Sequence, residues 1–318
     1  MNGRNPEQPI VALYNPEGYA VNFGRLAQSL ADEAKKAADK TVEVKLNENV
    51  VKIIRTVDGY ILKTANHEIR AQAVVVDADA YSLGFAKSLG YGQEFSLIPI
   101  AGTFYFTKNI LKGKVYTVQE PRLPFAAAHG DPDVNVPDST RWGPTARFVP
   151  VLESYKPRTM SAYLRSAGLG RLRTWLSFTK ILFEPVRFLY LTKNILFELP
   201  IIGKYLFVGS IKKIAPQVRA RDIRIAKGFG GMRLQRVDTR THELQLGEGK
   251  IIGDNIIFNM TPSPGASVCL YNGLRDAEKL MEFFKGEFAF DKTAMMRDLM
   301  DHPVSQTTDV SSKTSYSS

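Results

Sequence analysis

Cysteine is nearly absent from this sequence of 318 residues, which contains only Cys269. A single cysteine cannot form a disulfide within the chain, and this indicates a reducing compartment. Histidine is also scarce, and none lies at the spacing of zinc ligands, so we expect no metal site. The four histidines are His67, His129, His242 and His302.

Two kinds of apolar segment are missing as well. No run approaches the roughly 18 apolar residues of a membrane-spanning helix, and residues 1–9 show no apolar stretch after a basic start. We therefore expect a cytoplasmic protein. With 44% hydrophobic and 23% charged residues, the composition is that of a globular protein. Residues 303–318 are too polar to form a core, and we expect this tail to be disordered.

The sequence also has no glycine-rich dinucleotide loop. Gly-x-Gly triplets begin at Gly90, Gly168, Gly228 and Gly247, but each lacks the third glycine of the fingerprint. A phosphate-binding P-loop and a Gly-x-Ser-x-Gly elbow are missing too, which argues against an NTPase and a serine hydrolase.

Positive charge is concentrated in one block. The chain carries a net charge of +10, and residues 156–227 contain fifteen Lys or Arg against three acidic residues. Short apolar clusters alternate with these cations. The block fits basic amphipathic helices on an anionic membrane surface, and equally helices on a core with a solvated cationic face. Because no nucleic-acid module accompanies the charge, we expect no nucleic-acid partner.

The order of periodic segments predicts an α/β fold that is interrupted by a second, α+β domain. Asn22 can cap a first helix, and the apolar run at residues 73–76 predicts a buried strand that leads into a helix. A second strand-to-helix unit lies near the end of the chain. We expect helices at residues 23–38, 80–89 and 264–284, and strands at 42–46, 50–55, 60–64, 68–70, 73–76 and 256–259.

The middle of the chain predicts the inserted domain. Strands are expected between residues 97 and 118 and again up to residue 246, with the basic helical block at residues 153–216 between them. We place a nucleotide-binding domain at residues 1–96 and 250–302, and a mixed-sheet substrate domain with a helical insertion at residues 97–249.

Three local motifs could carry chemistry. In Ser263-Pro264-Gly265 the serine can cap a helix whose N-terminus attracts an electron-rich group, although a capped helix that binds nothing explains the motif as well. His129 can accept the hydroxyl proton of an alcohol as a general base, or be a hydrogen-bonded structural residue. Arg233, which follows a glycine-rich stretch, offers a fork for a carboxylate, as many surface arginines do.

A metal site built on Asp131 and Asp133 near His129 is a further alternative, but Pro132 favours a turn.

Taken in order, these segments resemble the malate:quinone oxidoreductase and L-2-hydroxyglutarate dehydrogenase group of the glycine-oxidase-like FAD superfamily. The resemblance extends to about Gly286 but excludes the N-terminal βαβ unit with its Gly-x-Gly-x-x-Gly loop, so the chain looks N-terminally truncated. Two positions depart from the family pattern, namely the acidic run at residues 77–80 and Leu234, where the family usually has proline. The resemblance is carried by residues 18–24, 47–51, 74–82, 98–102, 124–133, 142–145, 230–238 and 261–267.

The resemblance implies an FAD-dependent enzyme that oxidises a malate-like 2-hydroxy dicarboxylic acid. Hydride would pass to the flavin and the electrons to a quinone. His129 would be the catalytic base, with Arg233 and Gln235 on the substrate carboxylate. The cofactor would be held by the backbone of Val50, by Ala78 and Ser82 beneath it, and by Pro264, Gly265, Ala266 and Ser267 at the flavin ring.

The basic block would then reach the quinone from the inner face of the cell membrane, where the protein would be peripheral. L-2-hydroxyglutarate dehydrogenase or oxidase activity is an alternative, because the sequence does not define the shape of the pocket. A truncated chain without activity, which only binds a membrane or a partner, is another.

Overall fold

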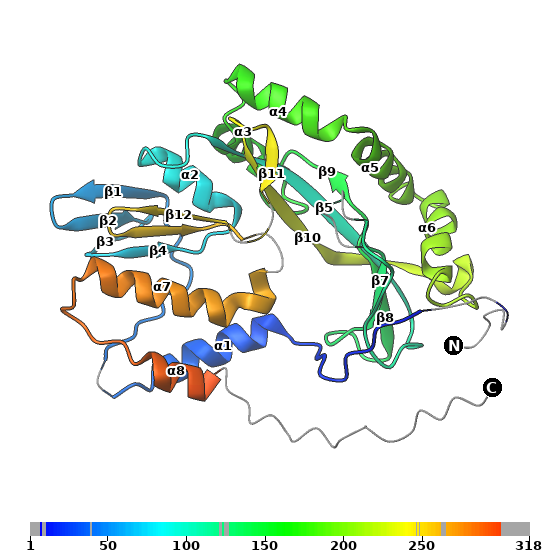
Figure 1. Cartoon of the computed structure of the whole chain (residues 1–318), viewed down its shortest axis with the longest axis horizontal. Helices are drawn as coiled ribbons and strands as arrows, with labels where there is room; N and C mark the ends of the chain where they lie inside the picture. Colours follow the sequence, from blue (N-terminus) through cyan, green and yellow to red (C-terminus); the bar gives the residue numbers. More distant parts are fainter. Residues whose placement is uncertain are drawn as a thin grey trace, which may run out of the picture. The chain divides into compact units, whose positions relative to one another are not determined.

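The computed structural model divides the chain into two compact units, residues 1–264 and 265–318. Figure 1 shows the helices and strands of each unit. The described residues are 7, 11–38, 40–120, 123, 127–245, 247, 249–261 and 265–299.

A seven-stranded sheet forms the larger part of the first unit. Its strand order is β11-β10-β5-β8-β7-β6, and β9 pairs with β5. The two long strands β5 (Phe95–Lys108) and β10 (Arg224–Asp238) run antiparallel at its centre. The shorter strands are β6 (Val115–Tyr116), β7 (His129–Pro132), β8 (Ser139–Gly143), β9 (Arg147–Phe148) and β11 (Glu243–Gln245).

Consecutive helices of the predicted basic block pack on this sheet, which confirms the helical prediction (Figure 1). Gly168, with a φ of 68°, ends the first of them, and Glu184 caps the third by accepting a hydrogen bond from the Arg187 amide. The ring of Phe207 stacks on Tyr105 of the sheet at 4.7 Å. The helices are α3 (Met160–Ala167), α4 (Leu172–Leu182), α5 (Pro185–Phe197) and α6 (Ile202–Lys212), with 3-10 turns at Pro157–Thr159 and Ala220–Asp222.

Two three-stranded sheets complete the first unit. One is an antiparallel meander of β1 (Lys52–Thr56), β2 (Gly59–Lys63) and β3 (Glu68–Ala71), as the turn residues predicted. In the other, with the order β12-β13-β4, β13 and β4 are parallel. This parallel pair confirms the α/β class. Its elements are β4 (Val74–Val76), α2 (Ala80–Ser88), β12 (Lys250–Gly253) and β13 (Ile256–Asn259).

The membership of the sheets changes between β4 and β5 and again between β11 and β12. The domain boundaries near residues 96 and 249 stay a prediction. Among the described residues, no helix is both long and apolar enough to cross a membrane.

One predicted segment was wrong and another was wrong in part. Residues 42–46 alternate like a strand but form none, because no strand pairs with them and their side chains are exposed. The first helix, α1 (Phe23–Ala34), starts after the predicted Asn22 cap but ends before residue 38. Its last turn tightens, since the Lys36 amide bonds to the Glu33 carbonyl.

The second unit is helical over its described residues. A 3-10 turn, η3 (Gly265–Val268), precedes α7 (Cys269–Phe283), so the α-helix begins five residues later than predicted. Lys292 of α8 (Lys292–Leu299) pairs with Glu278 of α7 at 2.7 Å. The tail predicted to be disordered, residues 303–318, lies outside the described residues.

Candidate functional site

His129 opens β7 and is 5% exposed. Its Nδ1 lies 3.0 Å from the Ala127 carbonyl oxygen, and because a carbonyl only accepts, Nδ1 carries the proton of the neutral ring. The lone pair is therefore on Nε2. Burial lowers the pKa of His129 to about 4, with contributions from the cations Lys114 and Arg233. The imidazole is neutral at pH 7 and able to accept a proton.

Two aromatic rings border this histidine. Strand pairing places Tyr116 of β6 directly opposite His129, with the ring centroids 4.7 Å apart, and Phe104 of β5 lies 6.4 Å away in an edge-on arrangement. Lys114 Nζ lies 5.0 Å from the Tyr116 ring centroid, which brings a cation to the same place.

Arg233 of β10 belongs to the same cluster. It acts on the pKa of His129, and the phenol of Tyr116 acts on the pKa of Arg233. Burial lowers the pKa of the guanidinium, and Tyr190 of α5 is a further neighbour. Among the described residues, no carboxylate forms an ion pair with Arg233. A half-buried guanidinium in this setting can bind a carboxylate from outside the chain.

Gln235 lies two positions beyond Arg233 on the same strand, so the two side chains emerge on one face of the sheet. Gln235 is buried, and Leu234 between them points into the core cluster on the other face. The structure thus brings His129 near Arg233 and places Gln235 on the face of Arg233. Their assigned roles stay predictions.

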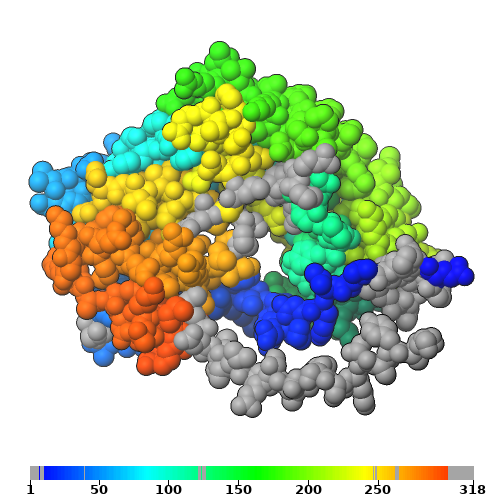
Figure 2. Space-filling view, in the orientation of Figure 1, coloured from blue at the N-terminus to red at the C-terminus, as the bar shows by residue number. Residues whose placement is uncertain are grey.

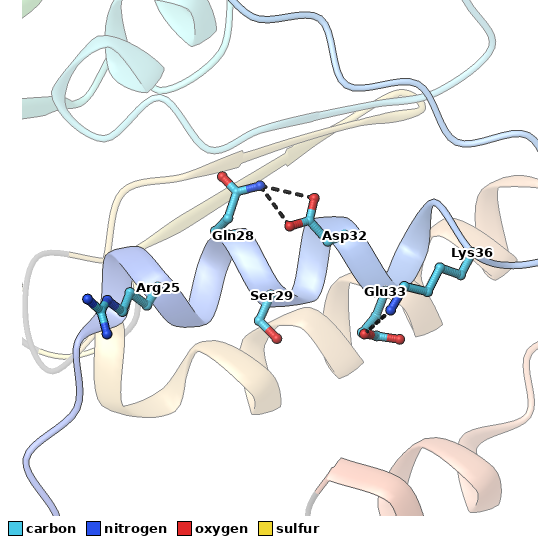
Figure 3. Close-up of a pocket in the computed structure, with 6 residues that line it drawn as sticks. All are labelled: Arg25, Gln28, Ser29, Asp32, Glu33 and Lys36. Carbon is cyan, nitrogen blue, oxygen red and sulfur yellow. Dashed lines mark hydrogen bonds and ion pairs between the residues drawn. The ribbon is translucent and has the colours of Figure 1, made fainter.

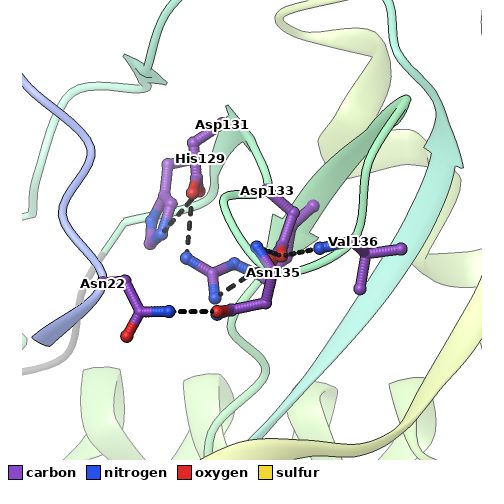
Figure 4. Close-up of polar contacts among 7 residues, drawn as sticks. Asn22, His129, Asp131, Asp133, Asn135 and Val136 are labelled. Carbon is purple, nitrogen blue, oxygen red and sulfur yellow. Dashed lines mark hydrogen bonds and ion pairs between the residues drawn. The ribbon is translucent and has the colours of Figure 1, made fainter. Parts of the chain in front are cut away.

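Asp131 and Asp133 both form ion pairs with Arg141 of β8. Figure 4 shows the two aspartates together with His129, Asn135 and Val136. The guanidinium lies 2.9 Å from Asp131 Oδ2 and 3.3 Å from Asp133 Oδ2. Asp133 Oδ1 accepts the amides of Asn135 and Val136, which forms the turn that the sequence favoured over a metal site. Within the described parts of the chain, no group of three potential metal ligands is found.

The predicted cofactor residues are distributed over both units. Val50 and Ala78 pack against the core cluster of the small sheets. Ser82 is fully buried, and its hydroxyl donates to the Val76 carbonyl while accepting the Ala78 amide. Ser82 therefore shapes the strand-to-helix turn. Gly265, Ala266 and Ser267 form η3 of the second unit, and Pro264 lies outside the described residues.

An open pocket of about 400 Å³ lies along α1 rather than at the predicted site residues (Figure 3). Its polar groups pair with each other, as Gln28 donates to Asp32 at 3.0 Å and Lys36 pairs with Glu33 at 2.6 Å. It contains none of the predicted site residues, so we assign the candidate site by its chemistry, at His129 and Arg233.

Sequence reasoning missed three members of the cluster, namely Lys114, Tyr116 and Tyr190. For Lys114 and Tyr116, the signal in the sequence was the alternating pattern of residues 114–118, which predicted a strand but not its partner. Tyr190 lies in the predicted helical block, but periodicity does not say which strand its side chain meets. The register that pairs Tyr116 with His129 exists only in the folded sheet.

Known proteins with related sequences are oxidoreductases. A probable malate:quinone oxidoreductase of Campylobacter jejuni is 44% identical over 276 residues, which cover 86% of this chain and 61% of that protein. Human mitochondrial L-2-hydroxyglutarate dehydrogenase is 25% identical over 286 residues, covering 81% of this chain and 57% of that protein. The FAD-bound, dithionite-reduced L-α-glycerophosphate oxidase of Mycoplasma pneumoniae superposes with a TM-score of 0.47 at 14% identity, covering 80% and 54% of the two chains.

The chain is thus an α/β protein with oxidoreductase relatives. The family model of malate:quinone oxidoreductase matches residues 1–300, and the chain belongs to this family. It spans 61% of the length of the Campylobacter relative.

Proposed function

We propose that this chain carries the substrate side of an FAD-dependent oxidoreductase, which oxidises a malate-like 2-hydroxy dicarboxylic acid and passes the electrons to a quinone. The supporting observation is the convergence of His129 and Arg233 from two different strands. A neutral base, and a guanidinium that no described carboxylate pairs with, are the two groups that a 2-hydroxy acid requires.

Each residue has a separate role in binding the substrate or in accepting its proton. Arg233 binds the carboxylate next to the hydroxyl-bearing carbon, and Gln235 on the same face donates a further hydrogen bond. Nε2 of His129 accepts the hydroxyl proton, because its other nitrogen is held by the Ala127 carbonyl. Phe104 and Tyr116 exclude water from the imidazole.

FAD supplies the hydride acceptor in this proposal, and the described residues fit it in part. The parallel strands β4 and β13 end side by side, where Asn259 donates to Asp77 at 2.5 Å. Nucleotides bind beyond the carboxyl ends of such strands. Val50 and Ala78 of the first unit would contact the cofactor there. The sequence contains no glycine-rich loop for the pyrophosphate.

Anaerobic mixing of the chain with FAD and L-malate tests this function. Loss of the oxidised-flavin absorbance is expected, and His129→Ala should slow it by about 10²–10⁴-fold because the base is removed. His67→Ala, an exposed histidine outside the cluster, is the control and should leave the rate unchanged. No reduction by malate or by L-2-hydroxyglutarate would refute the proposal for this chain. Faster reduction by L-2-hydroxyglutarate would select the alternative substrate.

We further propose that α4, α5 and α6 dock on an anionic membrane surface, where a quinone is reached. Their inner faces pack on the sheet, while their outer faces expose large apolar side chains. The space-filling view shows this part of the chain, in green, at the surface of the molecule (Figure 2). Exposed cations accompany these apolar groups, so apolar burial and attraction to lipid phosphates act together. The apolar residues are Leu172, Trp175, Leu176, Phe188, Leu189, Ile195, Leu196, Ile202, Tyr205 and Leu206, and the cations include Arg173, Lys180, Lys193 and Lys212.

The two tryptophans provide a probe for this docking. Trp175 is 53% exposed on α4, whereas Trp142 is 1% exposed and donates to Thr107. Vesicles containing anionic phospholipid should shift the fluorescence to the blue, and Trp175→Phe should abolish the shift.

Charge variants test the electrostatic part. Lys180→Gln with Lys193→Gln should weaken vesicle binding about 30-fold, since each cation near such a surface contributes about 1 kcal/mol. The matched control, Lys52→Gln with Arg70→Gln, removes two exposed cations from the small sheet and should bind normally. Equal weakening of vesicle binding in both double variants would show that binding depends on net charge alone, and would contradict docking through α4, α5 and α6.

A further inference from the structure

The two carboxylate oxygens of Asp131 have different surroundings. Oδ2 accepts a hydrogen bond from Arg141 Nη2 at 2.9 Å. Oδ1 is buried without a hydrogen-bond donor and lies 3.9 Å from Nε2 of His129 (Figure 4). Nε2 is the nitrogen without a proton, because Nδ1 donates to the Ala127 carbonyl. A buried acceptor therefore faces a nitrogen that has no hydrogen to give.

A purely structural pair would not be arranged in this way. A buried carboxylate oxygen without a donor is costly, and buried polar atoms are almost always satisfied. The contact becomes favourable once Nε2 carries a proton, because the imidazolium is then both a donor and an opposite charge. The arrangement suits the state of His129 after it has accepted a proton.

We propose that Asp131, held by Arg141, is a positioning residue that stabilises the proton on Nε2 of His129 after this proton has left the substrate hydroxyl. The role of His129 as the base rests on the proposed function, whereas the electrostatic pairing of the two side chains does not. The hydroxyl proton would move to Nε2 as the carbon–oxygen bond becomes a carbonyl. A bound flavin would supply the acceptor for the hydrogen that leaves the same carbon with its electron pair. The proton on Nε2 is later released to water.

The charges around the imidazole explain why such a partner is needed. Lys114 beside β6 and Arg233 of β10 both disfavour a cation at His129, while Asp131 is the carboxylate that favours it. The ring of Tyr116, which carries a further titratable group, lies 4.7 Å from the imidazole between centroids. Arg141 of β8 neutralises part of the Asp131 charge and fixes its orientation.

Nuclear magnetic resonance titration of histidine carbons in the full chain tests the pairing without cofactor or substrate. Asp131→Asn keeps the shape and removes the charge, so the pKa of His129 should fall by about one pH unit or more. Arg141→Gln should shift it in the opposite direction, because the carboxylate then acts on the imidazole without a competing cation.

Asp133→Asn is the matched control. Asp133 also pairs with Arg141, but through Nη1, whereas Asp131 pairs with Nη2. The amide oxygen of an asparagine at this position can still accept hydrogen bonds from the Asn135 and Val136 amides. The pKa of His129 should change by less than about 0.3 in this variant.

The outcomes separate the inference from the proposed function. An unchanged or raised pKa in Asp131→Asn overturns the pairing, as does a fall in Arg141→Gln, and each variant is sufficient if the other does not fold. If both shifts occur but the chain does not reduce flavin with malate, the pairing stands and the proposed function fails. In an active protein, Asp131→Asn should lower kcat with little change in KM and move the acidic limb of the pH profile.

Discussion

Replacing Arg233 with Met should stabilise the ligand-free chain and abolish its response to the substrate. Burial lowers the pKa of Arg233, and no carboxylate pairs with it among the described residues. Burying an unpaired ion costs several kcal/mol, but the neighbouring phenols and partial exposure recover much of that. We expect Arg233→Met to raise the free energy of unfolding by about 1–2 kcal/mol, or a few degrees in Tm.

The assay is thermal unfolding with and without L-malate. A dicarboxylate at 100 times its Kd should stabilise the native chain by about 2.7 kcal/mol, and Arg233→Met should lose this shift. Arg141→Met is the contrasting variant, because Arg141 pairs with both Asp131 and Asp133 and its loss should cost about 3–5 kcal/mol. A lower Tm in Arg233→Met, or an equal malate shift, would refute the reasoning.

Three further outcomes are expected. His129 has a pKa of about 4 in the folded chain and near 6.5 in the unfolded chain, so the unfolded chain binds more protons between these values and stability falls as the pH falls. Urea unfolding should therefore show a loss of about 2 kcal/mol in the free energy of unfolding from pH 7 to pH 5. This loss should be absent in His129→Asn. Gly203→Ala should lower the free energy of unfolding by more than about 2 kcal/mol, because its Cβ would lie 2.1 Å from the Phe197 carbonyl oxygen. Gly209→Ala in the same helix meets nothing within 4 Å and should raise that free energy by about 0.5–1 kcal/mol in the same urea assay. Asp79 has a φ of 47° and a ψ of −119°, which only glycine adopts without strain, so Asp79→Gly should raise Tm; a decrease would contradict strain at this turn.

Much of the local structure could be predicted from the sequence. The meander of β1, β2 and β3 follows from turn residues, among them Gly59 with a φ of 136°. The buried run at β4 and the helical block follow from apolar periodicity. Residues 42–46 show the limit of this reasoning, because a strand exists only when another strand supplies hydrogen bonds.

The site shows the same division. The candidate residues His129, Arg233 and Gln235 were predicted from residue type and from resemblance, since imidazole, guanidinium and amide groups suit a hydroxy acid. The neighbours Lys114 and Tyr116 could not be found in this way, because strand register decides which residues face His129.

By itself, the sequence determined the turns, the helical block, the family and the types of groups available for chemistry, since these depend on neighbouring residues and on residue identity. Only the tertiary structure decided that β6, β7 and β10 bring Tyr116, His129 and Arg233 together. It also decided that Asp131 pairs with Arg141 through Oδ2 while its Oδ1 lies 3.9 Å from Nε2 of His129. The pKa of His129 was decided there too, because burial and the distance to other charges arise only when distant segments pack.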